Sequence, residues 1–233
     1  MSASMSNNAH AFTFIWTDMD QLEEDGFNRW YNTEHMVERV QKIPGYISGR
    51  RFINQGIGSK YFAIYRVNSA EVFHTAAYLD LQSHPDENSR YFIPRFQNVF
   101  KIFATLGFET GQGGEGAHLA LIPFIQSFPA DVEHETVNHI SQALNQVHLQ
   151  NGLVATQYLK TNWDIVESVT SKFLRKTDTY FHGAILLEAT NAKSLKKSID
   201  ELEELVLGQL EPFLHSTRVN YLEQILSFHP KIS

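Results

Sequence analysis

The 233-residue sequence predicts an α+β fold in which two βαββαβ units pack against each other as one barrel. The order of strand-like and helix-like segments occurs twice, once on each side of residues 107–116, the most glycine-dense stretch of the chain. A four-stranded sheet with helices on one face leaves its other face uncovered, and two such faces can cover each other. We therefore expect two ferredoxin-like repeats, residues 1–110 and 111–233, that form an intramolecular dimeric α+β barrel.

The first half starts with a β-rich segment, residues 10–17, which ends near two potential helix caps, Asp18 and Asp20. A helix should follow to about Lys42, because Pro44 cannot continue it. Two strands joined by a Gly-Ile-Gly-Ser turn come next, followed by a helix, a shorter helical piece and a closing strand. We expect these five segments at residues 46–54, 60–67, 70–82, 91–99 and 101–108.

The same order follows the glycine-rich segment at residues 107–116, which we expect to be a flexible connector. In the second half Leu159 belongs to an apolar face, whereas Tyr158 lies on a face that mixes aromatic and polar residues. We expect helices to cover the apolar face and the mixed face to line the barrel. Such an interior could hold a ligand, or it could be a filled core. The expected strands are 117–125, 153–160, 180–188 and 217–228, and the expected helices are 131–150 and 192–210.

The composition excludes several classes of function. A formal net charge of −7 disfavours binding to the phosphates of nucleic acid. The chain has no cysteine, which excludes disulfides, thiolate metal sites, iron–sulfur clusters and a cysteine nucleophile. Residues 1–10 have neither the basic segment nor the apolar run of a signal peptide, and no stretch approaches the roughly 18 apolar residues of a membrane helix. We therefore expect a cytoplasmic protein with no nucleic-acid or membrane partner.

Two short segments resemble known binding motifs but lack the structural context or the spacing that those motifs require. Residues 111–116 match the glycine pattern of a dinucleotide fingerprint, but they precede a strand rather than the helix whose N-terminus would bind a pyrophosphate. His134 and His139 are five residues apart, which turns the two imidazoles about 140° away from each other on a helix. They cannot share a metal ion in that arrangement. We expect neither a metal nor a cofactor.

Residues 27–52 form the least generic segment of the chain. On a helix, Trp30 belongs to an apolar arc that should cover the sheet, whereas Tyr31, His35 and Glu38 form a stripe on the opposite side. The stripe contains an imidazole, whose ordinary pKa suits proton transfer near neutral pH. His35 is therefore the candidate acid or base. The structural alternative is a hydrogen-bonded helix surface that fixes a neighbouring arginine.

The strand after this helix carries Arg50 and Arg51, whose side chains must point to opposite faces of the sheet. Aligning the two halves places Arg51 over Tyr158, on the face that we expect to line the barrel. Arg50 should then lie beneath the helices, where an unpaired charge is costly. We expect Glu34 or Glu38 to be its partner.

The run Trp-Tyr-Asn-Thr-Glu-His-Met-Val-Glu-Arg, followed by Pro-Gly-Tyr and two arginines, resembles the motif of EthD-like members of the dimeric α+β-barrel superfamily. Those proteins usually have a proline where this chain has Val37, and the second half carries no corresponding motif. The superfamily includes isomerases, quinone-forming monooxygenases, polyketide cyclases and haem-dependent enzymes, so the fold selects no reaction. The matching positions are Trp30, Tyr31, Glu34, His35, Glu38, Arg39, Pro44, Gly45, Arg50 and Arg51.

The favoured function is a cofactor-independent lyase or isomerase that acts on a small apolar or aromatic compound. His35 is the candidate catalytic residue, and Arg51 would anchor a carbonyl or carboxylate group of the substrate. The alternatives are a non-catalytic ligand-binding or accessory protein and an assembly module with a filled barrel. Such pseudo-dimeric chains could also associate as a homo-oligomer. The candidate substrate-binding residues are Tyr31, Arg51, Tyr158 and His182, and the residues expected to support the motif structurally are Trp30, Glu34, Glu38 and Arg50.

Overall fold

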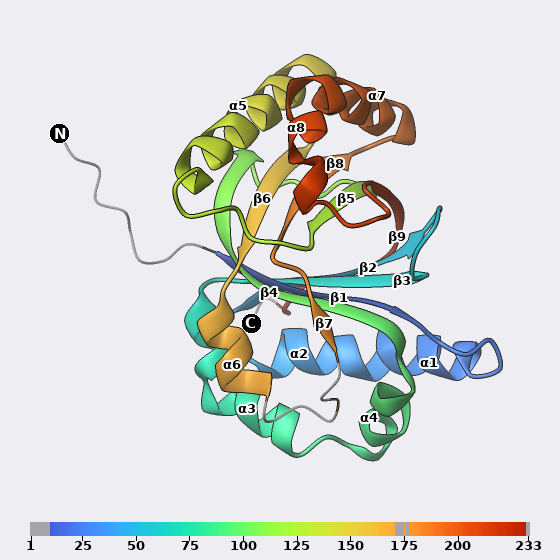
Figure 1. Ribbon diagram of the computed structural model, residues 1–233. Helices are drawn as coiled ribbons and strands as arrows, with labels where there is room; N and C mark the ends of the chain where they lie inside the picture. The colour runs from blue at the N-terminus through green and yellow to red at the C-terminus, as the bar shows by residue number, and fades with distance from the viewer. Residues whose placement is uncertain (1–9, 171–174, 176–177, 232–233) are drawn as a thin grey trace.

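The computed structural model describes residues 10–170, 175 and 178–231. Within these ranges eight strands close into an antiparallel barrel, in the order β1-β3-β2-β9-β5-β8-β6-β4, and β4 pairs back with β1 (Figure 1). A two-residue strand, β7 (Thr179–Tyr180), adds to β4 in parallel. The barrel strands are β1 (Ala11–Asp18), β2 (Tyr46–Asn54), β3 (Tyr61–Val67), β4 (Gln97–Gly111), β5 (His118–Phe124), β6 (Ala155–Thr161), β8 (Gly183–Ala189) and β9 (Asn220–Phe228).

The helices form two layers on opposite sides of the barrel, one with α1 to α4 and α6, the other with α5, α7 and α8 (Figure 1). This arrangement confirms the predicted α+β barrel. No helix in the described part of the chain is long and apolar enough to span a membrane. The helices are α1 (Glu24–Trp30), α2 (Met36–Lys42), α3 (Ala76–Ser83), α4 (Glu87–Phe92), α5 (Glu133–Asn151), α6 (Trp163–Thr170), α7 (Ala192–Leu202) and α8 (Gly208–Leu210), with π turns at Tyr31–His35 and Glu203–Leu207 and 3-10 turns at Ala70–His74, Ile93–Arg95 and Glu211–Phe213.

Each half of the chain contributes four neighbouring strands to the barrel. The first half supplies β4-β1-β3-β2, and the second half supplies β9-β5-β8-β6. Hydrogen bonds join the two groups at both edges, between β2 and β9 and between β4 and β6. The barrel is therefore one continuous sheet without a free edge between the halves.

Apolar side chains fill the centre of the barrel. The rings of Phe100 and Phe181 stack there with centroids 4.7 Å apart, and Trp16 and Phe14 pack beside them. The sequence leaves open whether the barrel is open or filled, and the structure shows a filled centre. The fully buried members of this core are Phe14, Trp16, Phe52, Phe62, Ile102, Ala104, Leu119, Leu121, Leu159, Phe181, Ala184, Leu186 and Leu222.

Several predicted elements differ from the observed ones. Residues 107–111 continue β4 instead of forming a connector. Gly107 gives room to the ring of Tyr158 on β6, because a Cβ atom at residue 107 would lie 2.7 Å from Tyr158 Cδ1. The predicted helix at residues 70–82 is a 3-10 turn followed by α3. The second helical piece is α4 followed by a 3-10 turn, and it ends at Arg95 rather than at residue 99. α6 has no counterpart among the predicted elements.

The predicted faces of the two arginines are wrong. Arg50 points into the barrel end, where it pairs with Glu188 of the second half at 2.7 Å. Arg51 lies under the helices, between Tyr31 and the side-chain amide of Asn28, to which it donates at 2.9 Å. Both faces of β2 carry aromatic and polar neighbours, so alternation separates the faces without showing which one is inside. The predicted acids have other partners, since Glu34 accepts from Asn88 and Glu38 pairs with Lys42.

Candidate functional site

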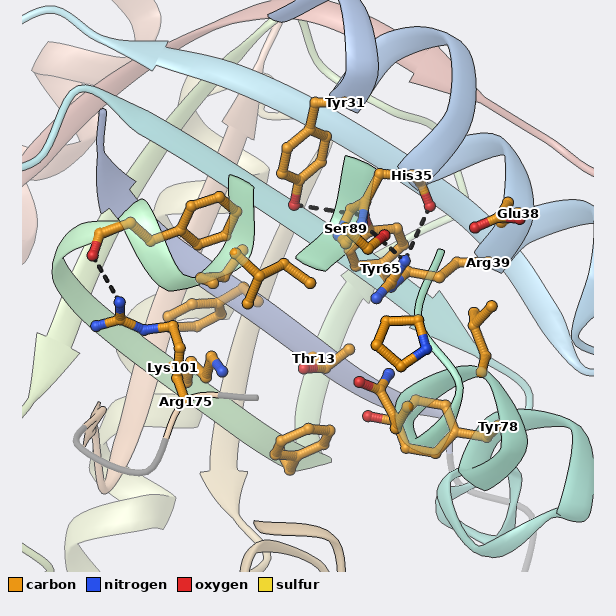
Figure 2. Close-up of a pocket in the computed structure, with 18 of the residues that line it drawn as sticks. Thr13, Tyr31, His35, Glu38, Arg39, Tyr65, Tyr78, Ser89, Lys101 and Arg175 are labelled. Carbon is orange, nitrogen blue, oxygen red and sulfur yellow. Dashed lines mark hydrogen bonds between the residues drawn. The ribbon is translucent and has the colours of Figure 1, made fainter. Parts of the chain in front are cut away.

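A cavity of about 90 Å³ lies in the helix layer of the first half, between the α1–α2 helix and the outer face of the sheet. Tyr31, Tyr65 and Tyr78 line it together with His35 (Figure 2), and Tyr46 is a fourth tyrosine in its wall. The cavity is smaller than the roughly 150 Å³ that accepts benzene in an engineered protein core. A ligand with one aromatic ring therefore needs part-exposed side chains at the rim to move outward.

The helix on one wall of the cavity contains a π turn. α1 passes into the π turn Tyr31–His35 and then into α2 without a break. Such turns are rare and often mark functional sites. Tyr31 and His35 are 1% and 5% exposed, so the stripe predicted to lie away from the sheet is in fact buried against the cavity. Trp30 packs behind His35, with ring centroids 4.3 Å apart, and stacks on Phe92.

His35 is held as a neutral imidazole. Burial lowers its pKa well below the ordinary value, and the positive charges of Arg39, Arg51 and Lys101 lower it further. Arg39 Nη1 lies 3.0 Å from His35 Nδ1, and because a guanidinium has only donors, Nδ1 must accept this hydrogen bond. The proton of the neutral ring is then on Nε2. His35 can therefore donate a hydrogen bond to a ligand, but it has no free lone pair with which to accept a proton.

The phenols around the cavity are also neutral. Burial raises the pKa of Tyr31, Tyr46, Tyr65 and Tyr78, so each keeps its hydroxyl proton at neutral pH. The hydroxyls of Tyr31 and Tyr65 lie 3.4 Å apart, at the limit of a hydrogen bond. The wall thus offers aromatic rings for packing and hydroxyls that donate to an oxygen atom.

Three cations face the same cavity, and sequence reasoning assigned a site role to none of them. Lys101 on β4 and Arg175 of the second half line the wall opposite Arg39 (Figure 2). Asp178 pairs with Lys101 at 2.5 Å and with Arg175 at 2.7 Å. Burial lowers the pKa of Lys101 despite this carboxylate. A lysine inside an otherwise apolar strand was the sequence signal that could have identified this part of the site.

The cavity does not collect all the predicted substrate-binding residues. Arg51 lies behind the ring of Tyr31, with its guanidinium carbon 4.3 Å from the ring centroid, and is not part of the cavity wall. Tyr158 and His182 lie in the second half, on a hollow of only about 10 Å³. His182 shares a hydrogen bond with Ser127 there, with 2.8 Å between the two atoms. The structure thus brings Tyr31 and His35 together and leaves Tyr158 and His182 elsewhere.

A larger hollow of about 530 Å³, the barrel-end bowl, opens at one end of the barrel. His10, Arg50, Arg66 and Glu188 are among the residues that line it. Its arginines have carboxylate partners, because Arg50 pairs with Glu188 and Arg66 pairs with Glu109. All three nitrogens of each guanidinium donate to protein acceptors. The smaller cavity at His35 is therefore the better candidate for chemistry.

In sequence, no protein-family model and no curated protein matches the chain. In structure, it is similar to an anthrone oxidase-like protein, with a TM-score of 0.65, 9% identity, and coverage of 97% of this chain and 95% of the other. A candidate monooxygenase from Lactobacillus acidophilus gives a TM-score of 0.59 at 8% identity, covering 95% and 96%. A haem-binding protein from Thermus thermophilus gives 0.56 at 9% identity, covering 94% and 92%. Identities this low show the fold alone. The chain therefore shares the α+β-barrel fold of these proteins.

Proposed function

We propose that the cavity at His35 binds a small aromatic molecule bearing a carbonyl or hydroxyl oxygen, and that the protein is a cofactor-independent enzyme of the lyase or isomerase type. The observation that carries this proposal is the protonation state of His35. A buried neutral imidazole that can donate through Nε2, beside three cations, suits the stabilisation of negative charge on a ligand oxygen. Aromatic walls supply the packing surface for the ring.

The proposed reaction begins with removal of a proton from a carbon next to the ligand carbonyl. Glu38 is the one carboxylate among the described residues that line the cavity, and it is the proposed base. The electrons of the broken C–H bond move to the carbonyl oxygen, where His35 and the cations stabilise the resulting enolate. Return of the proton to a different carbon gives isomerisation, and departure of a group from the neighbouring carbon gives elimination. His35 thus acts as a hydrogen-bond donor rather than as the base.

Other expectations from the sequence, on family, repeats, location and assembly, are proposals as well. We propose that the motif of residues 27–52 marks an EthD-like protein, because Trp30, Tyr31, His35 and Glu38 all lie on or directly behind one cavity wall. We also infer two ferredoxin-like repeats, divided near residue 110, since both halves have the strand order 4-1-3-2 of a βαββαβ unit. A cytoplasmic location and a homo-oligomer of this pseudo-dimeric chain stay predictions.

Haem does not fit the His35 cavity. Its volume is about 90 Å³, whereas sites for larger organic ligands usually measure roughly 300–1,000 Å³. Nδ1 of His35 accepts from Arg39, and the ring lies against Trp30. An axial ligand would have to be the protonated Nε2 nitrogen, beside a buried guanidinium. The proposed reaction accordingly uses this chain's own side chains.

Exchange of ligand protons with D₂O tests the proton-abstraction step and does not require a known product. Small aromatic ketones and ketoacids with an exchangeable C–H bond would be followed by ¹H NMR in the presence of the protein. We expect catalysed loss of that signal, at least about 100-fold slower in Glu38→Gln. Glu34→Gln is the matched control, because Glu34 lies on the same helix, outside the cavity, and contacts Asn88.

Two outcomes decide between the enzyme and the non-catalytic alternative. Exchange that depends on Glu38 supports the enzyme. Binding of these compounds with no catalysed exchange in any of them would instead show a ligand-binding or accessory protein that uses the same cavity.

A further inference from the structure

Arg39 is a buried guanidinium with no carboxylate partner among the described residues. It is 9% exposed and lies on α2, one helical turn after His35. Its Nη1 atom donates to Nδ1 and to the backbone carbonyl oxygen of His35, at 3.0 and 3.1 Å. The neighbouring Glu38 pairs with Lys42 instead, at 2.6 Å. A buried cation without a counter-charge is unfavourable in a folded protein, so its presence requires a reason.

Arg39 lines the cavity, and only one of its guanidinium nitrogens is bonded to a described protein acceptor. Figure 2 shows the guanidinium beside His35, at the inner end of a side chain that extends from α2. Nε and Nη2 form no hydrogen bond with any described residue. Because Nη1 is held by His35, the plane of the guanidinium is fixed. Nε and Nη2 then present two parallel N–H groups, which is the geometry that binds both oxygens of a carboxylate.

The surroundings of Arg39 also favour an anion. Lys101 and Arg175 line the cavity, and the single carboxylate of Asp178 is shared between them. Arg51, behind Tyr31, has amide and aromatic neighbours and no carboxylate within the described ranges. The described groups in and behind this wall therefore carry more positive than negative charge. In a site with little water, such a field attracts negatively charged ligands.

We propose that Arg39 anchors a carboxylate of the ligand, so that the substrates of this site are small aromatic carboxylates. The anchored carboxylate accepts hydrogen bonds from Nε and Nη2 of Arg39, and the ring packs on the tyrosines of the cavity. The assignment to a substrate rests on the proposed function, whereas the anchoring itself rests only on Arg39. The role is specific to arginine, because a lysine ammonium has no planar pair of donors.

Benzoate and benzamide are the probes that test this inference, because they share one shape and differ in charge. Their affinities for the full-length protein would be measured by calorimetry or by ligand-observed NMR. We expect benzoate to bind at least about tenfold more tightly than benzamide. Arg39→Met should remove this preference, and Arg39→Lys should retain only part of it. Arg29→Met is the matched control, because Arg29 lies on the same continuous helix but outside the cavity.

The affinities of the native protein for benzoate and benzamide test the proposal even if a variant fails to fold. A native protein that binds benzoate no better than benzamide, including one that binds neither, overturns the proposal. An unchanged preference in folded Arg39→Met overturns it as well. The proposed function can fail separately, with benzoate anchored and no ligand proton exchanged. Conversely, catalysed exchange in a ketone, together with no preference for benzoate over benzamide in the native protein, would support the enzyme and contradict the anchor.

Discussion

At the scale of single residues, the buried imidazole of His35 makes the stability of the protein depend on pH. Its pKa in the folded state lies well below the ordinary value of 6.5. Above pH 6.5 the ring is neutral in both the folded and the unfolded chain, and below that pH only the unfolded chain takes up the proton. Protonation of His35 in the unfolded chain therefore lowers the free energy of unfolding as the pH falls below 6.5. Above pH 6.5 this loss of stability is absent.

Comparison of the native protein with His35→Phe isolates this effect. Denaturant unfolding between pH 6.5 and 5 should show a steeper loss of stability in the native protein, by up to about 1.4 kcal/mol per pH unit. Tyr65→Phe is the control, because it removes a neighbouring hydroxyl and keeps the imidazole. Equal slopes for the native protein and His35→Phe would mean that His35 becomes charged in the folded state, and the donor role would be wrong.

At the scale of single elements, the π turn between α1 and α2 sets the direction of the site residues. It adds one residue to the helix, so that Tyr31 and His35 both face the cavity. Deletion of the exposed Thr33 should restore a regular α-helix and bring Tyr31 and His35 three residues apart, about 60° from each other around the helix axis. The helix content by circular dichroism should stay close to native, while binding of benzoate should be lost.

The substitution Thr33→Ala is the control for this deletion. It removes the hydrogen bond that the Thr33 hydroxyl donates to the backbone of Arg29, but it leaves the length of the helix unchanged. Binding should be preserved in the substitution. A deletion variant that folds and still binds benzoate with native affinity would show that the π turn does not orient the site.

The order of elements could be predicted from the sequence because each strand and helix has local signals. Pro44 ends the long helix, and alternating side chains mark the strands. Arg51 and Tyr158 both lie in the helix layers, so the face assigned to them was wrong. The partner of Arg50 is Glu188, which lies 138 residues further along the chain. No local pattern can reveal such a contact.

The site itself was predictable only in part. The motif identified one cavity wall, with Tyr31 and His35 on a single helix. Lys101 and Arg175 come from separate parts of the chain and meet only after the barrel closes. The orientation of His35 depended on a π turn, and a helical wheel of 3.6 residues per turn cannot represent that turn. The lack of a carboxylate partner for Arg39 among the described residues is visible only in three dimensions.

At the scale of the whole molecule, the ion pair between Arg50 and Glu188 links the two halves at the barrel end. Their side chains are 6% and 8% exposed. Arg50→Met leaves the carboxylate of Glu188 without its counter-charge, and we expect a loss of about 3–5 kcal/mol in the free energy of unfolding. The double variant Arg50→Met/Glu188→Leu should recover most of that loss, because an apolar pair can replace a buried ion pair.

Chemical denaturation of the two single variants and the double variant measures this coupling directly. Single-variant losses that simply add in the double variant would show that the pair does not act as a unit. The cavity at His35 lies in another layer of the molecule, so benzoate affinity should be unchanged in every folded variant of this set.

A crystal structure of the protein with benzoate tests most directly whether the His35 cavity is the ligand site. We predict that the rim opens and that the ring lies against Tyr65 and Tyr78. The carboxylate should lie within about 3 Å of Nε and Nη2 of Arg39, with Nδ1 of His35 still bonded to Nη1. Benzoate bound in the barrel-end bowl beside Arg50, with the His35 cavity unchanged, would contradict this account of the protein.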